Sequence, residues 1–129
     1  MATVTLTNDN FEQTIADNAI VLVDFWAQWC GPCRQFGPVF EESSEKHPNI
    51  VFGKIDTDAE QQIAMAAQIS SIPTLMAFRD GIAIFRQSGA LPGPALEDLI
   101  GQIEALDMDK VRADIAAQQA GEGAEAEQA

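Results

Sequence analysis

The two cysteines of the chain, Cys30 and Cys33, have only Gly31 and Pro32 between them, in the stretch WAQWCGPCRQ. Paired thiols at this spacing can bind a metal ion, form a structural crosslink, or cycle between a dithiol and a disulfide. A structural zinc site needs more Cys and His ligands than the 2 Cys and 1 His of this chain. A crosslink that closes so short a loop stabilises little. A redox-active dithiol is therefore favoured, with a metal site shared between two chains and a structural crosslink as alternatives.

The residues on either side of the cysteines predict a strand followed by a helix. Residues 19–25 (AIVLVDF) form a β-branched and aromatic run that is typical of a strand buried on both faces. A helix is predicted from about residue 33 to 46, with Pro38 bending it rather than ending it. The strand would bring Cys30 to the carboxyl edge of a sheet, where α/β folds bind ligands. The free N–H groups and positive dipole end of the helix would favour the reactive thiolate of Cys30.

Hydrophobic periodicity and turn residues predict the remaining elements. They are a strand at 4–6, a helix to residue 17 opened by an Asp9–Glu12 capping box, a strand at 50–56, a helix opened by a Thr57–Glu60 capping box, a hairpin of 73–78 and 82–88 around Asp80-Gly81, and an amphipathic helix from Pro94. The order β-α-β-α-β-α-β-β-α predicts an α/β fold with a central mixed sheet and helices on both faces.

The composition changes after residue 106. Residues 1–106 are predicted to form one domain, and residues 107–129 an acidic C-terminal extension with six acids and two bases. We expect a weak short helix over 107–119 and a disordered tail after it. His47 follows the helix that carries the cysteines, and it is interpreted as a surface residue that interacts with the negative helix terminus.

The net charge of −13 argues against binding to nucleic acid or to an anionic membrane. The longest apolar stretch is interrupted by Asp24 and is too short to cross a bilayer. The polar residues after Met1 do not resemble a secretion signal, so the predicted location is the cytoplasm. Stable disulfides are rare in that compartment, which further favours a catalytic cysteine pair.

Residues 23–33 (VDFWAQWCGPC) resemble the active-site stretch of thioredoxins, in which WCGPC is the family signature. The resemblance extends over residues 3–106 and includes SIPT at 71–74, SGAL at 88–91, and the final amphipathic helix. It implies the thioredoxin fold and the activity of a protein-disulfide reductase that maintains cytosolic thiols and donates electrons to target proteins. The Gly-Pro pair between the cysteines is similar to that of reductants, which disfavours an oxidase or isomerase.

The resemblance also implies roles for individual residues. Cys30, expected to be exposed at the tip of the helix, would be the nucleophile. Cys33, expected to be the more buried of the two, would be the resolving thiol. Asp24 would accept and donate the proton of Cys33, although a structural, hydrogen-bonded Asp or a strand-edge residue is the alternative interpretation. Lys54 matches the lysine that accompanies this Asp, and a solvent-facing strand lysine is its alternative.

Further positions would tune the redox pair or bind the target. Trp29, Gly31 and Pro32 would set the redox character, with ordinary packing as the alternative for Trp29. A groove for an extended target peptide would be formed by Ile72, Pro73 with a cis bond before it, Gly89 and Ala90.

The resemblance implies neither a bound cofactor nor a metal, because the dithiol itself carries the electrons. The disulfide would be reduced indirectly by NADPH through a thioredoxin reductase. That reductase and disulfide-containing target proteins are the expected partners of a monomeric protein. The alternative function is a thioredoxin-fold holdase or assembly protein in which redox turnover is incidental.

Overall fold

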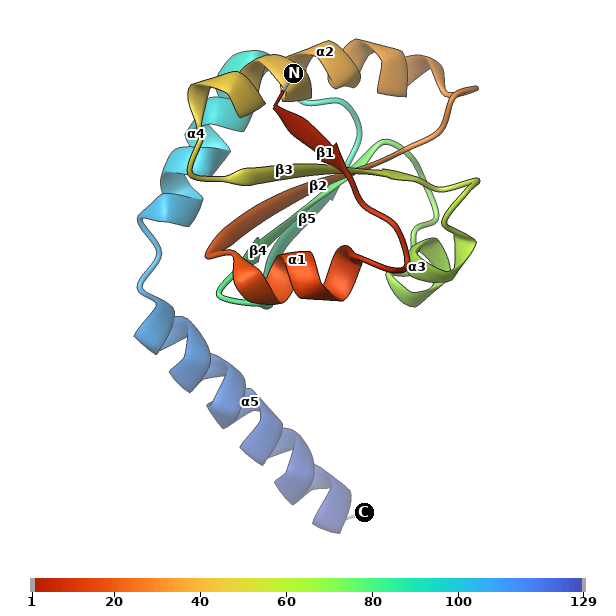
Figure 1. The fold of residues 1–129 in the computed structure, drawn as a ribbon. Helices are drawn as coiled ribbons and strands as arrows, with labels where there is room; N and C mark the ends of the chain where they lie inside the picture. The colour runs from red at the N-terminus through yellow and green to blue at the C-terminus, as the bar shows by residue number, and fades with distance from the viewer. Residues whose placement is uncertain (1, 129) are drawn as a thin grey trace. The chain divides into compact units, whose positions relative to one another are not determined.

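The computed structural model describes the backbone of residues 2–128 and the side chains of residues 2–120. Strands and helices alternate along most of the chain (Figure 1). The elements are β1 (Thr3–Thr5), α1 (Phe11–Asp17), β2 (Ile20–Trp26), α2 (Gly31–Lys46), β3 (Val51–Asp56), α3 (Gln61–Ala66), β4 (Thr74–Arg79), β5 (Ile82–Ser88), α4 (Gly93–Glu104) and α5 (Met108–Gln128).

The strands form one mixed sheet in the order β1-β3-β2-β4-β5. Strands β1, β3 and β2 are parallel to one another, whereas β4 is antiparallel to both β2 and β5. Helices α1 and α3 lie on one face of the sheet and α2 lies on the other (Figure 1). The predicted α/β fold with a mixed sheet covered on both faces is therefore confirmed.

Strand β2 lies in the middle of the sheet and is buried on both faces. Because side chains alternate along a strand, its residues divide into two sets. Val21, Val23 and Phe25 belong to an apolar cluster with which Phe11 and Ile15 of α1 also pack. The intervening residues point to the opposite face, which α2 covers. The single strand thus serves both the core and the layer that holds the cysteines.

Gly53 in the middle of β3 is explained by a close approach of another side chain. It pairs with Val23 of β2, and a Cβ atom built at Gly53 would lie 2.3 Å from Cδ1 of Leu6. Leu6 is buried in the same apolar cluster as Val23. Glycine at position 53 therefore makes room for the leucine that follows β1.

The hairpin between β4 and β5 has the predicted turn, but two helix starts differ from the prediction. Asp80 and Gly81 both have positive φ, +53° and +80°, as a type I′ turn requires. The predicted capping boxes are wrong, because α1 and α3 begin after Asn10 and Glu60, and neither residue makes a side-chain cap. The hydroxyl of Thr57 instead donates to the carbonyl oxygen of Trp26 at 3.1 Å.

The C-terminal part of the chain is helical, and α5 extends to Gln128, beyond the short helix predicted over 107–119. The side chains of residues 121–129 lie outside the described part of the chain, so the predicted disorder there stays a prediction. The chain divides into two compact units between Leu99 and Ile100, within α4. The domain boundary after residue 106 also stays a prediction. None of the described helices is long and apolar enough to cross a membrane.

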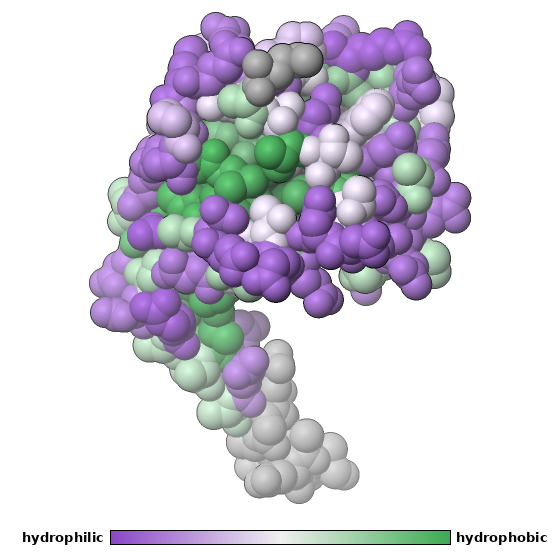
Figure 2. Space-filling model, viewed as in Figure 1, coloured by the Kyte–Doolittle hydropathy of each residue, from purple (hydrophilic) through white to green (hydrophobic). Residues whose placement is uncertain are grey.

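The face shown in Figure 2 is largely hydrophilic, in keeping with the acidic composition, and some hydrophobic residues are also exposed on it. Val4 of the edge strand β1 is one of the exposed large hydrophobic residues, with 45 % of its surface accessible. Strand β1 has only three residues, which limits its exposed edge.

Candidate active site

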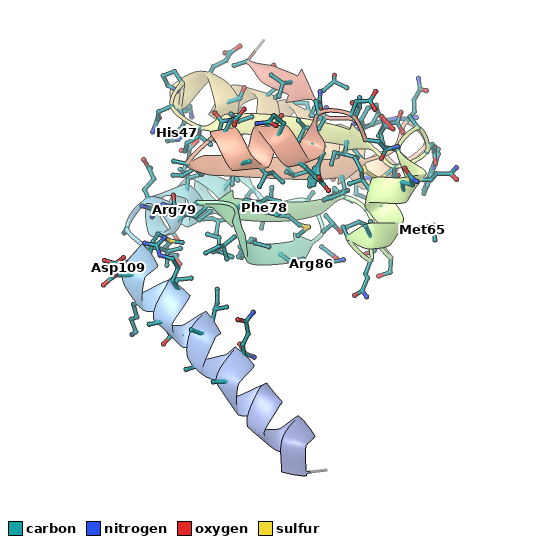
Figure 3. The ribbon with its side chains drawn as sticks, turned by 60° about the horizontal axis from the view of Figure 1, so that its bottom comes forward. His47, Met65, Phe78, Arg79, Arg86 and Asp109 are labelled. Atoms are coloured by element: carbon teal, nitrogen blue, oxygen red, sulfur yellow. A yellow bond between two sulfur atoms is a disulfide. The ribbon has the colours of Figure 1, made fainter. Side chains whose placement is uncertain are left out.

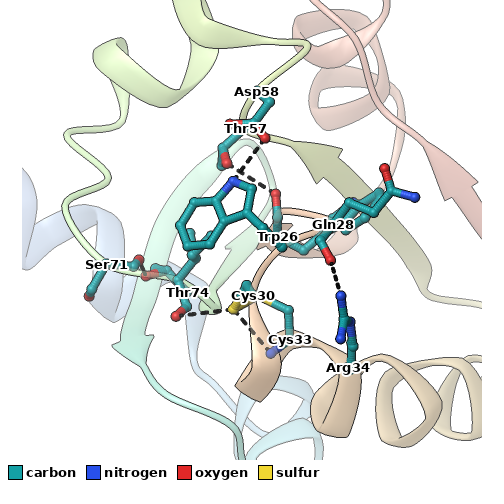
Figure 4. The surroundings of a disulfide bond; sticks show 11 residues. Trp26, Gln28, Cys30, Cys33, Arg34, Thr57, Asp58, Ser71 and Thr74 are labelled. Atoms are coloured by element: carbon teal, nitrogen blue, oxygen red, sulfur yellow. Dashed lines mark hydrogen bonds between the residues drawn. A yellow bond between two sulfur atoms is a disulfide. The ribbon is translucent and has the colours of Figure 1, made fainter.

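The cysteines lie where β2 gives way to α2 (Figure 4). Cys30 is the N-cap of α2, and Cys33 lies in the first turn of that helix. The two residues form a disulfide with their Cα atoms 5.2 Å apart. Pro32 lies at the start of the helix, where its missing N–H costs no hydrogen bond. The predicted strand–cysteine–helix arrangement is thus present, and α2 continues through Pro38 to Lys46.

The sulfur of Cys30 lies in an environment that favours negative charge. Its Sγ accepts a hydrogen bond from the backbone N–H of Cys33 at 3.2 Å. The free N–H groups at the start of a helix, together with the helix dipole, attract an anion. The carbonyl oxygen of Ile72 lies 3.6 Å from the same sulfur, so Cys30 also faces the segment before β4.

The burial of the two cysteines differs from the prediction. Cys30 was expected to be exposed and Cys33 to be the more buried, but the accessible fractions are 4 % and 5 %. The disulfide is packed with Ala27 and is covered by Trp26 and Ile72, which explains the low exposure of both. Exposure in this oxidised state therefore does not distinguish the two residues, whereas their positions on α2 do.

Asp24 is fully buried in β2, and neither of its carboxylate oxygens has a hydrogen-bond partner among the described residues. Burial raises the pKa of Asp24 to about 7, and the positive charge of Lys54 acts in the opposite direction. The structure therefore does not show the hydrogen-bonded structural Asp that was the alternative interpretation. A carboxyl group with a pKa near neutrality can both accept and release a proton.

Lys54 lies beside Asp24 in the sheet, because the two residues are paired in register across β3 and β2. Its side chain is half-buried rather than solvent-facing, with Nζ 5.0 Å from the centre of the Trp26 ring. A Cβ atom at Gly37 of α2 would lie 3.8 Å from this Nζ. Lys54 therefore extends between the sheet and α2.

A cavity of about 430 Å³ opens next to this group of residues. Its lining includes Trp26 of β2, Lys54 of β3, and Cys33, Arg34 and Glu41 of α2. The indole N–H of Trp26 and one carboxylate oxygen of Glu41 are buried without a hydrogen-bond partner among the described residues. The cavity is open to solvent beside Cys33, and its lining is mostly apolar apart from a few polar groups.

The residues of the predicted target groove are brought together on the other side of Cys30. The Ile72–Pro73 peptide bond is cis, the conformation that the resemblance implies. The N–H of Gly89 donates to the carbonyl oxygen of Pro73 at 2.8 Å, and Gly89 has φ of +100°, which favours glycine. Ala90 follows and is exposed.

Trp29 is 68 % exposed, and its indole N–H donates to Asp58 at 2.9 Å. It therefore stands beside the disulfide and does not cover it. Asp58 and Trp26 contact the predicted site residues Trp29 and Lys54, and the sequence does not predict either contact. Their contacts join separate elements, and spacing along the chain contains no signal for them.

Among the residues that the structure describes, no group of three or more His, Cys, Asp and Glu side chains is arranged to hold a metal ion. His47 caps the C-terminus of α2, and its Nε2 lies 2.6 Å from Glu97 of α4. It is half-buried in this contact instead of free at the surface.

Comparisons with known proteins agree with this arrangement. The thioredoxin family profile matches residues 2–102. The chain is 58 % identical over 122 residues to the putative thioredoxin 2 of Streptomyces coelicolor, covering 95 % of this chain and 91 % of that protein. It is 44 % identical over 94 residues to a thioredoxin of Coprinus comatus, covering 71 % of this chain and 88 % of the relative.

Solved structures of thioredoxins have the same fold. The thioredoxin of Malassezia sympodialis superposes with a TM-score of 0.73 at 35 % identity, covering 81 % of this chain and 96 % of that one. The thioredoxin of Plasmodium falciparum superposes with a TM-score of 0.71 at 33 % identity, covering 78 % of this chain and 97 % of that one. With the redox-capable Cys30–Cys33 pair at the tip of α2, these matches show that the chain belongs to the thioredoxin family and acts as a thioredoxin-type disulfide reductase.

Proposed function

We propose that Cys30 is the attacking thiolate of this reductase and that Cys33 is the resolving thiol. The observation that carries this assignment is the hydrogen bond from the N–H of Cys33 to the sulfur of Cys30 at the N-terminus of α2. This position stabilises a thiolate on Cys30 more than on Cys33, which lies inside the first turn. The neighbours Trp29, Gly31 and Pro32 are exposed, so a protein substrate can approach the pair.

The reaction proceeds by two exchanges of disulfide bonds. The Cys30 thiolate attacks one sulfur of the target disulfide, forms a mixed disulfide with it, and releases the other target sulfur as a thiolate. The Cys33 thiolate then attacks Cys30, which forms the Cys30–Cys33 disulfide and releases the second target thiolate. The target gains two electrons, and the cysteine pair of the protein loses them.

Asp24 is proposed to accept the proton of Cys33 before the second exchange. Its carboxylate has no hydrogen-bond partner within the described part of the chain. This and its pKa of about 7 fit a group that exchanges protons near neutral pH. Lys54, paired with it in register, moderates the rise in the pKa of Asp24. Lys54 lines the cavity that also borders Cys33, and the proton is proposed to leave to solvent through that cavity.

The target peptide is proposed to bind in extended form along Ile72, Pro73, Gly89 and Ala90. Ile72 faces the sulfur of Cys30 through its carbonyl oxygen, so a peptide paired with its backbone brings its disulfide to the nucleophile. Gly31 and Pro32 begin α2 beside this groove and fix the spacing of the two sulfurs. Trp29, exposed and held by Asp58, borders the same region.

The electrons are proposed to come from NADPH through a thioredoxin reductase, and the protein to act in the cytoplasm as a monomer. Family membership supports this supply, because the reduced cysteine pair must be regenerated after each turnover. The partners are that reductase and proteins with accessible disulfides.

The assignment is tested by trapping with single Cys variants. Cys33→Ser should accumulate mixed disulfides with target proteins, visible on non-reducing gels and released by dithiothreitol, because the second exchange is blocked. The matched variant Cys30→Ser should form none. Adducts with Cys30→Ser, or their absence with Cys33→Ser, would contradict the assigned roles.

A further inference from the structure

The segment between α3 and β4 supplies the backbone on which the proposed target groove depends. It begins at Ala67, the C-cap of α3, and ends at the cis Ile72–Pro73 bond. These residues belong to neither a helix nor a strand, so their conformation depends on contacts with neighbouring elements. Strand β5 makes several of those contacts.

The segment starts with a backbone conformation that its sequence disfavours. Gln68 has φ of +56°, in the left-handed region. The N–H groups of Gln68 and Ile69 donate to Met65 and Ala64 at 3.0 Å each, which is the Schellman pattern of a helix end. Glycine is usual at this position, because a side chain is strained there. Gln68 therefore needs support from outside α3.

Arg86 of β5 supplies that support. Its Nη1 donates to the carbonyl oxygen of Ala67 at 2.5 Å, and its Nη2 donates to that of Gln68 at 2.6 Å. Arg86 pairs with Met76 in the sheet and projects toward α3 (Figure 3). The planar guanidinium holds two successive carbonyls at once, and its charge lies at the negative end of the helix.

A second contact holds the far end of the segment from the same side of β5. The hydroxyl of Ser88, two residues after Arg86, bonds to the hydroxyl of Ser71 at 2.9 Å and lies 3.3 Å from that of Thr74. The Thr74 hydroxyl in turn donates to the carbonyl oxygen of Ser71 at 2.6 Å. Strand β5 thus holds the segment both where it leaves α3 and where it enters β4.

We propose that Arg86 is a positioning residue for target binding, which fixes the turn at Gln68 and thereby sets the backbone of Ile72 at the nucleophile. The inference rests on the proposed groove at Ile72 and Pro73. Arg86 touches neither sulfur among its described contacts, so it acts on the binding of the target and leaves the intrinsic exchange chemistry of Cys30 unchanged.

The test compares two substrates, since a small disulfide does not need the groove. With dithiothreitol as reductant, Arg86→Met should raise the KM for insulin about tenfold. A change of this size is expected from the loss of about one or two charged hydrogen bonds. The rate with dithiobisnitrobenzoate should stay within about twofold of the wild type, as expected when the interaction removed serves only binding. Arg112→Met, which removes an exposed charge from α5, is the matched control and should change neither value.

A second substitution tests the route by which Arg86 acts. Glycine adopts positive φ without strain, so Gln68→Gly added to Arg86→Met should restore most of the insulin KM. If Arg86→Met alone does not fold, the insulin KM of the double variant is measured instead. An insulin KM that stays low in Arg86→Met, equal losses with both substrates, or a double variant without recovery would each overturn the inference.

The proposed groove is tested separately by Ala90→Phe, which places a bulky ring at its lip. A raised insulin KM in Ala90→Phe with no effect of Arg86→Met would leave the groove in place and remove only the role of Arg86. If Ala90→Phe also has no effect, the groove itself is wrong, and the inference is overturned with it.

Discussion

The two faces of strand β2 are equally buried but chemically different. On the side of α1 and α3, Val21, Val23 and Phe25 belong to an apolar cluster. On the side of α2, Asp24 is fully buried with no hydrogen-bond partner for its oxygens among the described residues. A buried carboxylate without partners costs free energy. The comparison shows that one face of the strand stabilises the fold, while the other tolerates a destabilising group at the site of the chemistry.

The largest effect is expected when a carboxylate is placed on the apolar face of β2. Val23→Asp should lower the free energy of unfolding by more than about 4 kcal/mol at neutral pH, because the apolar cluster offers no partner for a charge. Urea unfolding followed by circular dichroism measures the loss. Val23→Asn, of the same size but uncharged, should cost less. A stable Val23→Asp protein would mean that both faces accept a carboxylate.

Removing the charge of Asp24 should have the opposite effect on stability. The folded protein holds this proton up to about pH 7, whereas the unfolded chain releases it near the ordinary value of 3.8. The folded state therefore binds more protons between these values, and wild-type stability falls as the pH rises through this window. Asp24→Asn should remove that slope and raise the free energy of unfolding by up to about 4 kcal/mol above pH 7.

The measurement for Asp24→Asn is urea unfolding of the oxidised protein at several pH values between 4 and 9. Parallel pH profiles of the wild type and the variant would contradict the burial of an ionisable Asp24. The same variant should reduce insulin about 100-fold more slowly, which is the usual size of a lost proton acceptor. A gain in stability together with a loss in rate is what the comparison predicts for the α2 face.

On the apolar face, Gly53→Ala should be destabilising although it adds only one methyl group. The new Cβ would lie 2.3 Å from Leu6, so the cluster must shift. A loss of about 1–3 kcal/mol is expected for overpacking of this kind. The control is the double variant Leu6→Ala/Gly53→Ala, in which the shorter side chain leaves room for the new methyl group. Its loss of stability should therefore be smaller than the sum of the losses of the two single variants. Additive losses would show that Leu6 does not occupy the space above Gly53.

The smallest expected effect concerns Glu97, a half-buried carboxylate that, unlike Asp24, has hydrogen-bond partners. Glu97 accepts a hydrogen bond from Ser43 at 2.9 Å and lies 2.6 Å from His47. Burial acts to raise the pKa of Glu97, but these hydrogen bonds outweigh that effect and hold the pKa below 4.5. Its contribution is therefore present above that pH and is lost as the pH falls through the lowered value. Glu97→Gln should cost about 1 kcal/mol at pH 6.

Thermal or urea unfolding at pH 6 and pH 3 measures the effect of Glu97→Gln. The difference from the wild type should shrink at the lower pH. A difference that is the same at both values would mean that the charge of Glu97 plays no part in the contact between α2 and α4.

Strong local patterns predicted most of the fold. The apolar run of β2, the turn residues Asp80 and Gly81, and the cysteine spacing at a strand–helix junction are all signals within a few residues. The capping boxes were wrong because the relevant side chain is used elsewhere: Thr57 donates to the carbonyl oxygen of Trp26, which belongs to another strand. Competition of that kind depends on tertiary structure and cannot be read from a short pattern.

The parts of the site that the sequence did not predict are contacts between distant segments. Glycine is required at position 53 because Leu6 packs against it, and the turn at Gln68 is held by a hydrogen bond from Arg86. The equal burial of Cys30 and Cys33 follows from packing with Ala27, Trp26 and Ile72, which spacing along the chain does not contain. The reactive residues lie close together in the sequence and could therefore be predicted, whereas the contacts from distant segments that hold them in place could not.

The most direct test is the alkylation of the reduced protein by iodoacetamide as a function of pH, with the modified cysteine identified by mass spectrometry. The helix N-terminus should make Cys30 react first, with half-maximal rate at a pH below about 8.5, the value for a free cysteine. Reaction at Cys33 first, or a midpoint at or above that of a free thiol, would contradict the assignment of Cys30 as the nucleophile.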